Sequence, residues 1–178
     1  QGHMPLITSI SGIRGTIGGK PGENFTPIDV VSFSSAYAAW LKDQNKKLGK
    51  TKLKIAIGRD ARPSGLLVHN LVSSVMISMG IDVLDLGLST TPTVEMMVVM
   101  KNCDGGIVIT ASHNPVEWNA LKLLNVQGEF LSASDGEKIL DYSRSKEFNY
   151  TDVHQIGKII SFDGGIREHI DAILDLDD

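Results

Sequence analysis

The sequence contains one cysteine, Cys103, in 178 residues, so it cannot form an intrachain disulfide. Disulfides belong to oxidising compartments, and their absence here favours a cytoplasmic location. No apolar run approaches the roughly 18 residues that cross a bilayer, so we expect no membrane partner. Basic residues are not in excess, because 17 Lys and Arg stand against 21 Asp and Glu. A net charge of −4 argues against nucleic acid as a partner, since phosphate backbones attract clustered Lys and Arg.

The length and the 42% content of hydrophobic residues predict a globular domain with a sizeable core. Residues 1–3 look like a cloning scar, and we expect the natural chain to begin at Met4. Residues 145–156 are polar and lack periodicity, which is typical of a linker. We therefore expect one domain over 4–155, followed over 156–178 by a linker and the truncated start of a second domain.

Apolar runs alternate with amphipathic segments along most of the chain, which predicts an α/β fold. We expect a mixed, mostly parallel sheet sandwiched by helices. Thr26 and Pro27 begin the first helix, and Ser134 with Glu137 forms a capping box for the fourth. The expected helices cover 25–47, 64–79, 91–101 and a segment ending near 144; the expected strands cover 52–58, 81–86 and 105–110, with a hairpin over 120–125 and 129–131.

The stretch "ITASHNPVEW" interrupts this pattern, because a buried-looking strand ends at Thr110 in a polar turn. In parallel α/β sheets, chemistry collects just past the carboxyl ends of strands. Ser112 offers a hydroxyl there, His113 a group for proton transfer, and Asn114 an amide that can fix the turn. Pro115 prevents a helix from continuing through the segment.

Two other interpretations of this turn remain open from the residues alone. The same residue types form ordinary turns without any catalysis. A serine hydrolase is the other, although adjacent side chains project in different directions, so His113 is a poor base for Ser112. The sequence also has no G-x-S-x-G element.

A second unusual stretch, "SGIRGTIGGKPG" at 11–22, surrounds Arg14 and Lys20 with glycine. Glycine-rich backbone can approach an anion closely, and an arginine can pair with phosphate through two hydrogen bonds. The spacing is that of neither a P-loop nor a dinucleotide fingerprint. It therefore indicates anion binding only in combination with other signals.

The segments "SGIRG", "GRDARPSG" and "TASHNP…K" occur in an order and spacing that resemble the α-D-phosphohexomutases. This family contains phosphoglucomutases, phosphomannomutases and phosphoglucosamine mutases, and the resemblance covers residues 4–178. It implies the first domain of an isomerase that interconverts hexose 1-phosphate and hexose 6-phosphate through a phosphoserine and a bisphosphate intermediate.

The resemblance implies a role for seven residues. Ser112 matches the phosphoryl carrier, and His113 matches a residue for positioning or proton transfer. Arg14 and Lys122 match cations at the reacting oxygen and phosphoryl group. With Asn114 they would bind the substrate phosphate, while the pair Arg59 and Asp60 would support the serine loop.

The resemblance also implies partners that this sequence does not supply. Mg²⁺ would meet only the phosphate on Ser112, because the family's Asp-rich metal loop is absent and "DLDD" at 175–178 reads as solvated acid. A sugar bisphosphate activator, a hexose phosphate and the remaining domains of the chain are the other expected partners, and the isolated fragment should be inactive. Ala120 stands where the family often has glycine, so a positive φ there is less favourable.

Two further functions stay open at this point. One is a Ser-dependent phosphatase or hydrolase, and the other is an anion-binding α/β domain without turnover.

Overall fold

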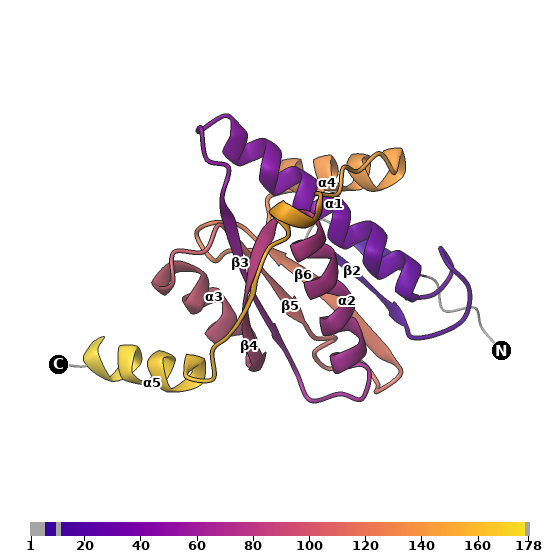
Figure 1. The fold of residues 1–178 in the computed structure, drawn as a ribbon. Coiled ribbons are helices and arrows are strands. Elements are labelled where there is room, and N and C mark those ends of the chain that lie inside the picture. Colours follow the sequence, from indigo (N-terminus) through magenta and orange to yellow (C-terminus); the bar gives the residue numbers. More distant parts are fainter. Residues whose placement is uncertain (1–5, 10–11, 177–178) are drawn as a thin grey trace.

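A computed structural model describes residues 6–9 and 12–176, and the segment expected to be a cloning scar lies outside these ranges. One sheet lies between two layers of helices (Figure 1). Its strands are β1 (Ile7–Ser9), β2 (Gly12–Thr16), β3 (Leu53–Arg59), β4 (Ile81–Leu88), β5 (Gly105–Ile109), β6 (Trp118–Leu124) and β7 (Ile159–Ser161). The helices are α1 (Pro27–Lys46), α2 (Gly65–Ser78), α3 (Thr91–Met100), α4 (Ala133–Ser145) and α5 (Gly165–Leu176), with a short 3₁₀ turn over Val153–Gln155.

The sheet has the order β1-β2-β6-β5-β3-β4-β7, and it is mixed as predicted. The pairs β3–β5, β3–β4 and β4–β7 are parallel, whereas β1–β2, β2–β6 and β5–β6 are antiparallel. The prediction of a mostly parallel sheet is therefore wrong in proportion. The sheet has more antiparallel pairs than expected because β1 and β2 add an antiparallel edge beside β6. These two segments were not predicted as strands.

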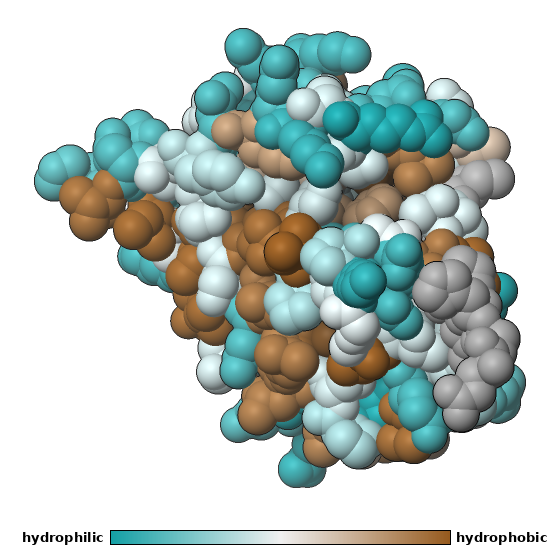
Figure 2. Space-filling model, turned by 90° about the vertical axis from the view of Figure 1, so that its right-hand side faces the viewer, coloured by the Kyte–Doolittle hydropathy of each residue, from teal (hydrophilic) through white to brown (hydrophobic). Residues whose placement is uncertain are grey.

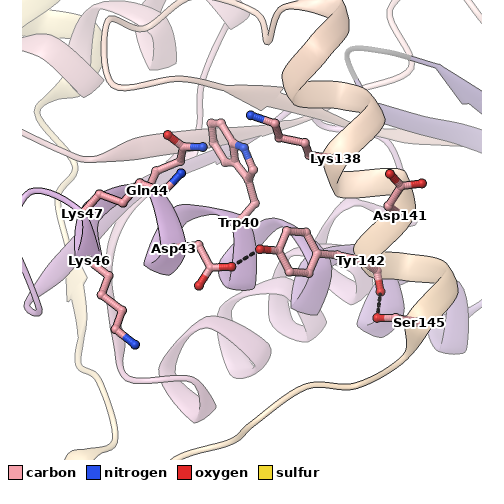
Figure 3. A pocket seen from close by; sticks show the side chains of 9 residues that line it. All are labelled: Trp40, Asp43, Gln44, Lys46, Lys47, Lys138, Asp141, Tyr142 and Ser145. Carbon is pink, nitrogen blue, oxygen red and sulfur yellow. Dashed lines mark hydrogen bonds between the residues drawn. The ribbon is translucent and has the colours of Figure 1, made fainter.

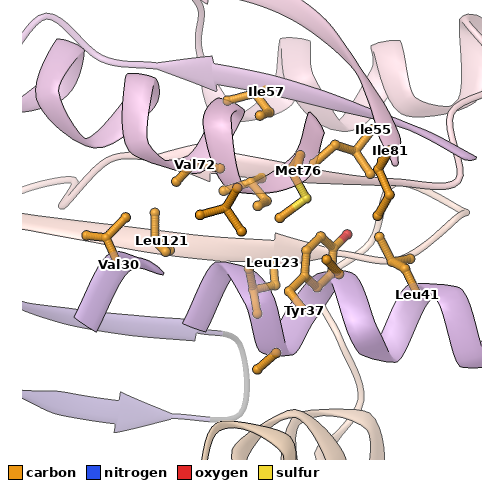
Figure 4. Close-up of a cluster of buried hydrophobic side chains, with 14 of the residues drawn as sticks. Val30, Tyr37, Leu41, Ile55, Ile57, Val72, Met76, Ile81, Leu121 and Leu123 are labelled. Carbon is orange, nitrogen blue, oxygen red and sulfur yellow. The ribbon is translucent and has the colours of Figure 1, made fainter. Parts of the chain in front are cut away.

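Side chains from α1, α2 and α4 meet one face of the sheet in the larger of two apolar clusters (Figure 4). Among these residues, Tyr37 is fully buried and its hydroxyl donates a hydrogen bond to Leu124 O at 2.5 Å. It also accepts one from Gly106 N at 3.0 Å. The phenol thereby satisfies backbone groups of β5 and β6 inside the core, where an unpaired group is costly. The second cluster lies under α3 on the opposite face.

The predicted start of the first helix is confirmed. Thr26 is the N-cap, Pro27 follows it, and Asp29 completes a capping box. The predicted capping box of α4 is wrong, because the cap is Ser132, whose side chain accepts from Asp135 N. Residues 129–131 form no regular strand; one bridge and the Asn125–Glu129 hydrogen bond close the turn after β6.

Cys103 is buried, with 2% of its surface exposed. Burial raises the pKa of Cys103 to about 11. Because the thiolate is the reactive species, a thiol with this pKa is inert near neutral pH.

The C-terminal segment extends the sheet rather than leaving it. β7 pairs with β4 in parallel, and Phe162 packs against the cluster under α3. Glu168 Oε2 of α5 lies 2.9 Å from Nζ of Lys101, the residue that follows α3. Ile170 and Leu174 of α5 are nevertheless 51% and 59% exposed. Figure 2 shows that hydrophobic residues are exposed among hydrophilic ones on one face of the molecule. Where one domain ends and the next begins stays a prediction.

Within the described ranges, no helix is at once long enough and apolar enough to cross a membrane.

Candidate functional site

The loop between β5 and β6 carries the polar turn singled out from the sequence. Two backbone hydrogen bonds shape it, from Asn114 N to Ala111 O at 3.0 Å and from Trp118 N to Pro115 O at 2.9 Å. Ser112 is exposed at its tip and has a φ of 52°. A left-handed conformation is unfavourable for a residue with a Cβ, and such residues concentrate at functional sites.

The hydroxyl of Ser112 lies against a lysine ammonium. Lys122 Nζ donates a hydrogen bond to Ser112 Oγ at 2.6 Å. Lys122 sits in β6 opposite Val108 of β5 and Gly12 of β2, so three strands fix its backbone. Its neighbours Val108 and Leu124 belong to the cluster under α3, which places Lys122 on that face of the sheet.

Arg14 joins the same surface from β2. It pairs with Ala120 in the antiparallel register, two residues from Lys122 along β6, so both side chains leave the sheet on one face. Both line a depression of about 150 Å³ together with Ser9. The structure thus brings together the two cations that the sequence analysis selected.

The Arg62 side chain binds the backbone of the serine loop. Arg62 was not among the site residues predicted from the sequence. Its Nη1 donates to Pro115 O at 3.2 Å and to Trp118 O at 2.6 Å. Its Nη2 donates to Ser112 O at 3.2 Å, while its Nε lies 3.0 Å from Asp60 Oδ2. One guanidinium therefore ties both ends of the loop to the segment that follows β3.

The predicted pair of Arg59 with Asp60 is wrong in its cation. Asp60 pairs with Arg62 and accepts a hydrogen bond from Thr110 Oγ1 at 2.7 Å. Arg59 instead places Nη1 3.3 Å from Nδ1 of His69. Successive strand residues point to opposite faces, so Arg59 and Asp60 reach different sides of the sheet.

The other two selected residues make fewer contacts. His113 is exposed and makes no hydrogen bond within the described part of the chain, so its predicted role stays a prediction. Asn114 closes the turn with its main-chain N–H, rather than through the side-chain amide as expected. Ala120 is a regular residue of β6 without positive φ, so its replacement of glycine leaves the strand intact.

Asn119, immediately before Ala120, is fully buried, and its side chain links β6 to the segment before α2. Its Nδ2 donates to Ser64 Oγ at 2.9 Å, and its Oδ1 accepts from Ala120 N at 2.8 Å. Together with Arg62, this contact joins the serine loop and β6 to the segment before α2. The loop is thus held by the fold and not by its own sequence alone.

His69 is a buried titratable residue between two charged groups. Its Nε2 lies 2.9 Å from Asp85 Oδ1, and its Nδ1 faces Arg59. Burial lowers the pKa of His69 from 6.5, against the opposing effect of Asp85. Folding therefore favours the neutral form of the His69 imidazole.

This shift predicts a pH dependence of stability. Below pH 6.5 the unfolded chain binds a proton at His69 that the folded protein resists, so the free energy of unfolding should decrease as the pH falls. Urea titrations from pH 7.5 to 5 measure it. His69→Gln should flatten the profile, whereas the exposed control His154→Gln should leave it unchanged. A profile that is the same in all three proteins would contradict the assignment.

No group of His, Cys, Asp and Glu side chains within residues 6–9 and 12–176 is arranged to hold a metal ion. The Asp60 carboxylate, which contacts Thr110 at the start of the serine loop, is occupied by Arg62 and Thr110. The described residues alone therefore do not fit a Mg²⁺ site. Residues 177–178 of the acidic chain end lie outside the described ranges.

A larger groove lies elsewhere, between α1 and α4 (Figure 3). It has a volume of about 740 Å³, and Trp40 and Tyr142 line it with Lys138. Tyr142 donates a hydrogen bond to Asp43 within it. It opens on the face of the sheet opposite Lys122 and contains none of the residues selected from the sequence.

Comparison with known proteins agrees with this geometry. The family described as "Phosphoglucomutase/phosphomannomutase, alpha/beta/alpha domain I" matches residues 6–150. The chain is 34% identical over 161 residues to the phosphoglucomutase/phosphomannomutase of Thermococcus kodakarensis, covering 89% of this chain and 34% of that protein. It is 35% identical over 152 residues to the phosphoglucosamine mutase of Nautilia profundicola, covering 85% of this chain and 33% of that protein.

A solved structure has the same fold. A phosphoglucomutase/phosphomannomutase family protein from Burkholderia thailandensis superposes with a TM-score of 0.73 at 19% identity, over 91% of this chain and 35% of that one.

Fold and family model together define the class as an α/β/α domain of the hexose-phosphate mutase type. The chain belongs to the phosphoglucomutase/phosphomannomutase family and corresponds to its domain I. It spans about a third of the length of the curated relatives that it matches.

Proposed function

We propose that this domain carries the phosphoryl group of a phosphohexomutase, which interconverts hexose 1-phosphate and hexose 6-phosphate through phosphorylated Ser112. The observation that carries the proposal is the 2.6 Å contact between Lys122 Nζ and the exposed, left-handed Ser112. A phosphoryl carrier needs a hydroxyl held at a fixed position with a cation beside it, because phosphoryl transfer depends on positioning and charge stabilisation.

The chemistry proceeds in two matched transfers. A hydroxyl oxygen of the hexose phosphate attacks the phosphorus of phosphoserine and the P–O bond to Ser112 Oγ breaks. The proton of the attacking hydroxyl is balanced by protonation of Oγ, which restores the serine hydroxyl. The resulting hexose bisphosphate then returns its other phosphate to Ser112 Oγ. Lys122 is placed to stabilise the negative charge on Oγ as that bond breaks, and Arg14 lies on the same face for the phosphoryl oxygens.

Further partners belong to the proposal and not to the described residues. The chain matches about a third of its relatives' length, which supports further domains in the same chain. We expect those domains to bind the sugar and a metal. When bound, Mg²⁺ would supply charge neutralisation at the phosphate on Ser112. A hexose bisphosphate would serve to phosphorylate the enzyme initially.

One contact favours a second candidate. A lysine in hydrogen-bond contact with a serine hydroxyl is also the arrangement of Ser–Lys hydrolases. In that function Lys122, rather than the exposed His113, would take the proton from Ser112.

Assays of glucose 1-phosphate, glucosamine 1-phosphate and an ester separate these functions. We expect mutase turnover only from the protein that includes the further domains, and none from residues 1–178 alone, because positioning of both ends of the sugar is lost. Ester hydrolysis by residues 1–178 that disappears in Ser112→Ala would favour the hydrolase. Absence of both activities in the longer protein would favour a binding domain.

Lys122→Met should lower mutase kcat by about 10²–10³-fold, the usual effect of removing one group that stabilises developing charge. The matched control is Lys138→Met, since Lys138 is exposed on α4 across the sheet. Equal kcat in the two variants would contradict the assigned role of Lys122.

A further inference from the structure

The left-handed conformation of Ser112 requires a support that the loop cannot provide alone. Ser112 is exposed, and its N–H donates only to Thr110 Oγ1, at 3.0 Å. Residues held at positive φ persist where surrounding groups over-determine them. The question is therefore which groups outside the loop fix it.

Arg62 contacts the loop at three carbonyl oxygens spread over its whole length. These belong to Ser112, Pro115 and Trp118, at 3.2, 3.2 and 2.6 Å. The Arg62 side chain is 10% exposed. Its hydrogen bond to Trp118 O is partly buried, whereas those to Ser112 O and Pro115 O lie at the surface. A planar guanidinium offers several donors in a fixed fork, which an ammonium cannot reproduce.

The Asp60 carboxylate fixes the guanidinium in turn. It accepts from Arg62 Nε at 3.0 and 3.2 Å, and it accepts from Thr110 Oγ1 at 2.7 Å. Thr110 Oγ1 is the same atom that accepts the Ser112 N–H. A closed ring of contacts thus runs from Asp60 through Arg62 to the Ser112 carbonyl, and through Thr110 to the Ser112 amide.

We propose that Arg62 is a positioning residue for phosphoryl transfer, which acts by holding Ser112 Oγ at Lys122 through this ring. The inference rests on the proposed function of Ser112. Arg62 touches only the backbone of the loop and Asp60, so it contributes nothing to sugar binding. Its loss should therefore lower kcat for transfer to and from Ser112 and leave KM unchanged.

The test compares Arg62→Met, Arg62→Lys and the control Arg144→Met in the protein that includes the further domains. Arg144 is an exposed arginine paired with Asp141 on α4, far from the loop. We expect Arg62→Met to lower kcat about 100-fold, the usual effect of a misplacement near 1 Å, with KM within threefold of the wild type. Arg62→Lys should recover little, and Arg144→Met should match the wild type.

A second pair of variants guards against misfolding. Thr110→Val removes the hydroxyl that joins Asp60 to the Ser112 amide while keeping the shape, and Thr110→Ser restores it. Thr110→Val should reproduce the loss of kcat, Thr110→Ser should rescue it, and amide exchange should accelerate over 112–118 in Thr110→Val and Arg62→Met only.

The outcomes separate this inference from the proposed function. Unchanged kcat in Arg62→Met, or a raised KM with unchanged kcat, overturns the positioning role. Equal kcat in Thr110→Val and Thr110→Ser overturns the ring of contacts. A wild-type enzyme without turnover or Ser112 phosphorylation overturns the proposed function, and amide exchange of the loop then decides the role of Arg62 by itself: unchanged exchange in Arg62→Met overturns it.

Discussion

Ser112→Ala is expected to reduce mutase turnover below detection, with a loss of at least about 10⁴-fold in kcat. The substitution removes the oxygen that accepts and returns the phosphoryl group, and no other described hydroxyl is hydrogen-bonded to Lys122. A nucleophile that forms a covalent intermediate splits one difficult step into two easier ones, and that route closes without it. Coupled assays of glucose 1-phosphate conversion measure the effect.

The matched control is Ser134→Ala, because Ser134 is an exposed serine in the first turn of α4 and lies away from the site. Its kcat should equal that of the wild type. Both variants should keep the wild-type melting temperature, since Ser112 makes its side-chain contact at an exposed position. Turnover that survives in Ser112→Ala would remove Ser112 from its proposed role.

Among the substitutions proposed for this protein, Gly12→Ala is expected to lower the free energy of unfolding the most. A Cβ at position 12 would lie 1.8 Å from Leu121 O, which belongs to the backbone of β6. Gly12 also has a φ of 150°, so the added methyl can be relieved only by separating β2 from β6. We expect about 3 kcal/mol or more of destabilisation, in the upper part of the range for single substitutions.

Gly18→Ala is the control that isolates the clash. Gly18 also has a positive φ, of 92°, but a Cβ there would meet no atom within 4 Å. Its substitution should cost only the backbone preference, about 1–2 kcal/mol. Urea denaturation followed by circular dichroism measures both. Equal destabilisation by the two substitutions would contradict the close approach of β2 to β6.

The regular part of the fold was predictable because its signals are local. The buried apolar runs of β3, β4 and β5 and the capping residues Thr26 and Pro27 each indicate their element without reference to distant parts of the chain. The N-terminal strands were missed for a physical reason. β1 is short and β2 contains two glycines, so neither has a strong signal of its own. β2 is fixed by pairing with β6, more than 100 residues away, and β1 by pairing with β2.

The reactive groups of the site were also predictable, but their support was not. Ser112 and Lys122 stand in distinctive stretches, and the structure brings them into contact. Arg62 was overlooked because the groups that it binds in the serine loop are backbone carbonyls, which carry no sequence signal. The alternation of side chains along β3 argued against pairing Arg59 with Asp60. Arg59 shares a face with Ile55 and Ile57, and both of these isoleucines belong to the larger apolar cluster.

The measurement that tests the account most directly is the location of phosphate on the protein after incubation with a hexose bisphosphate. Peptide mass spectrometry of the longer protein should find one phosphate on Ser112, and a hexose monophosphate should then remove it as hexose bisphosphate forms. Phosphate on another residue, or full turnover of a protein that never carries phosphate at Ser112, would contradict the account.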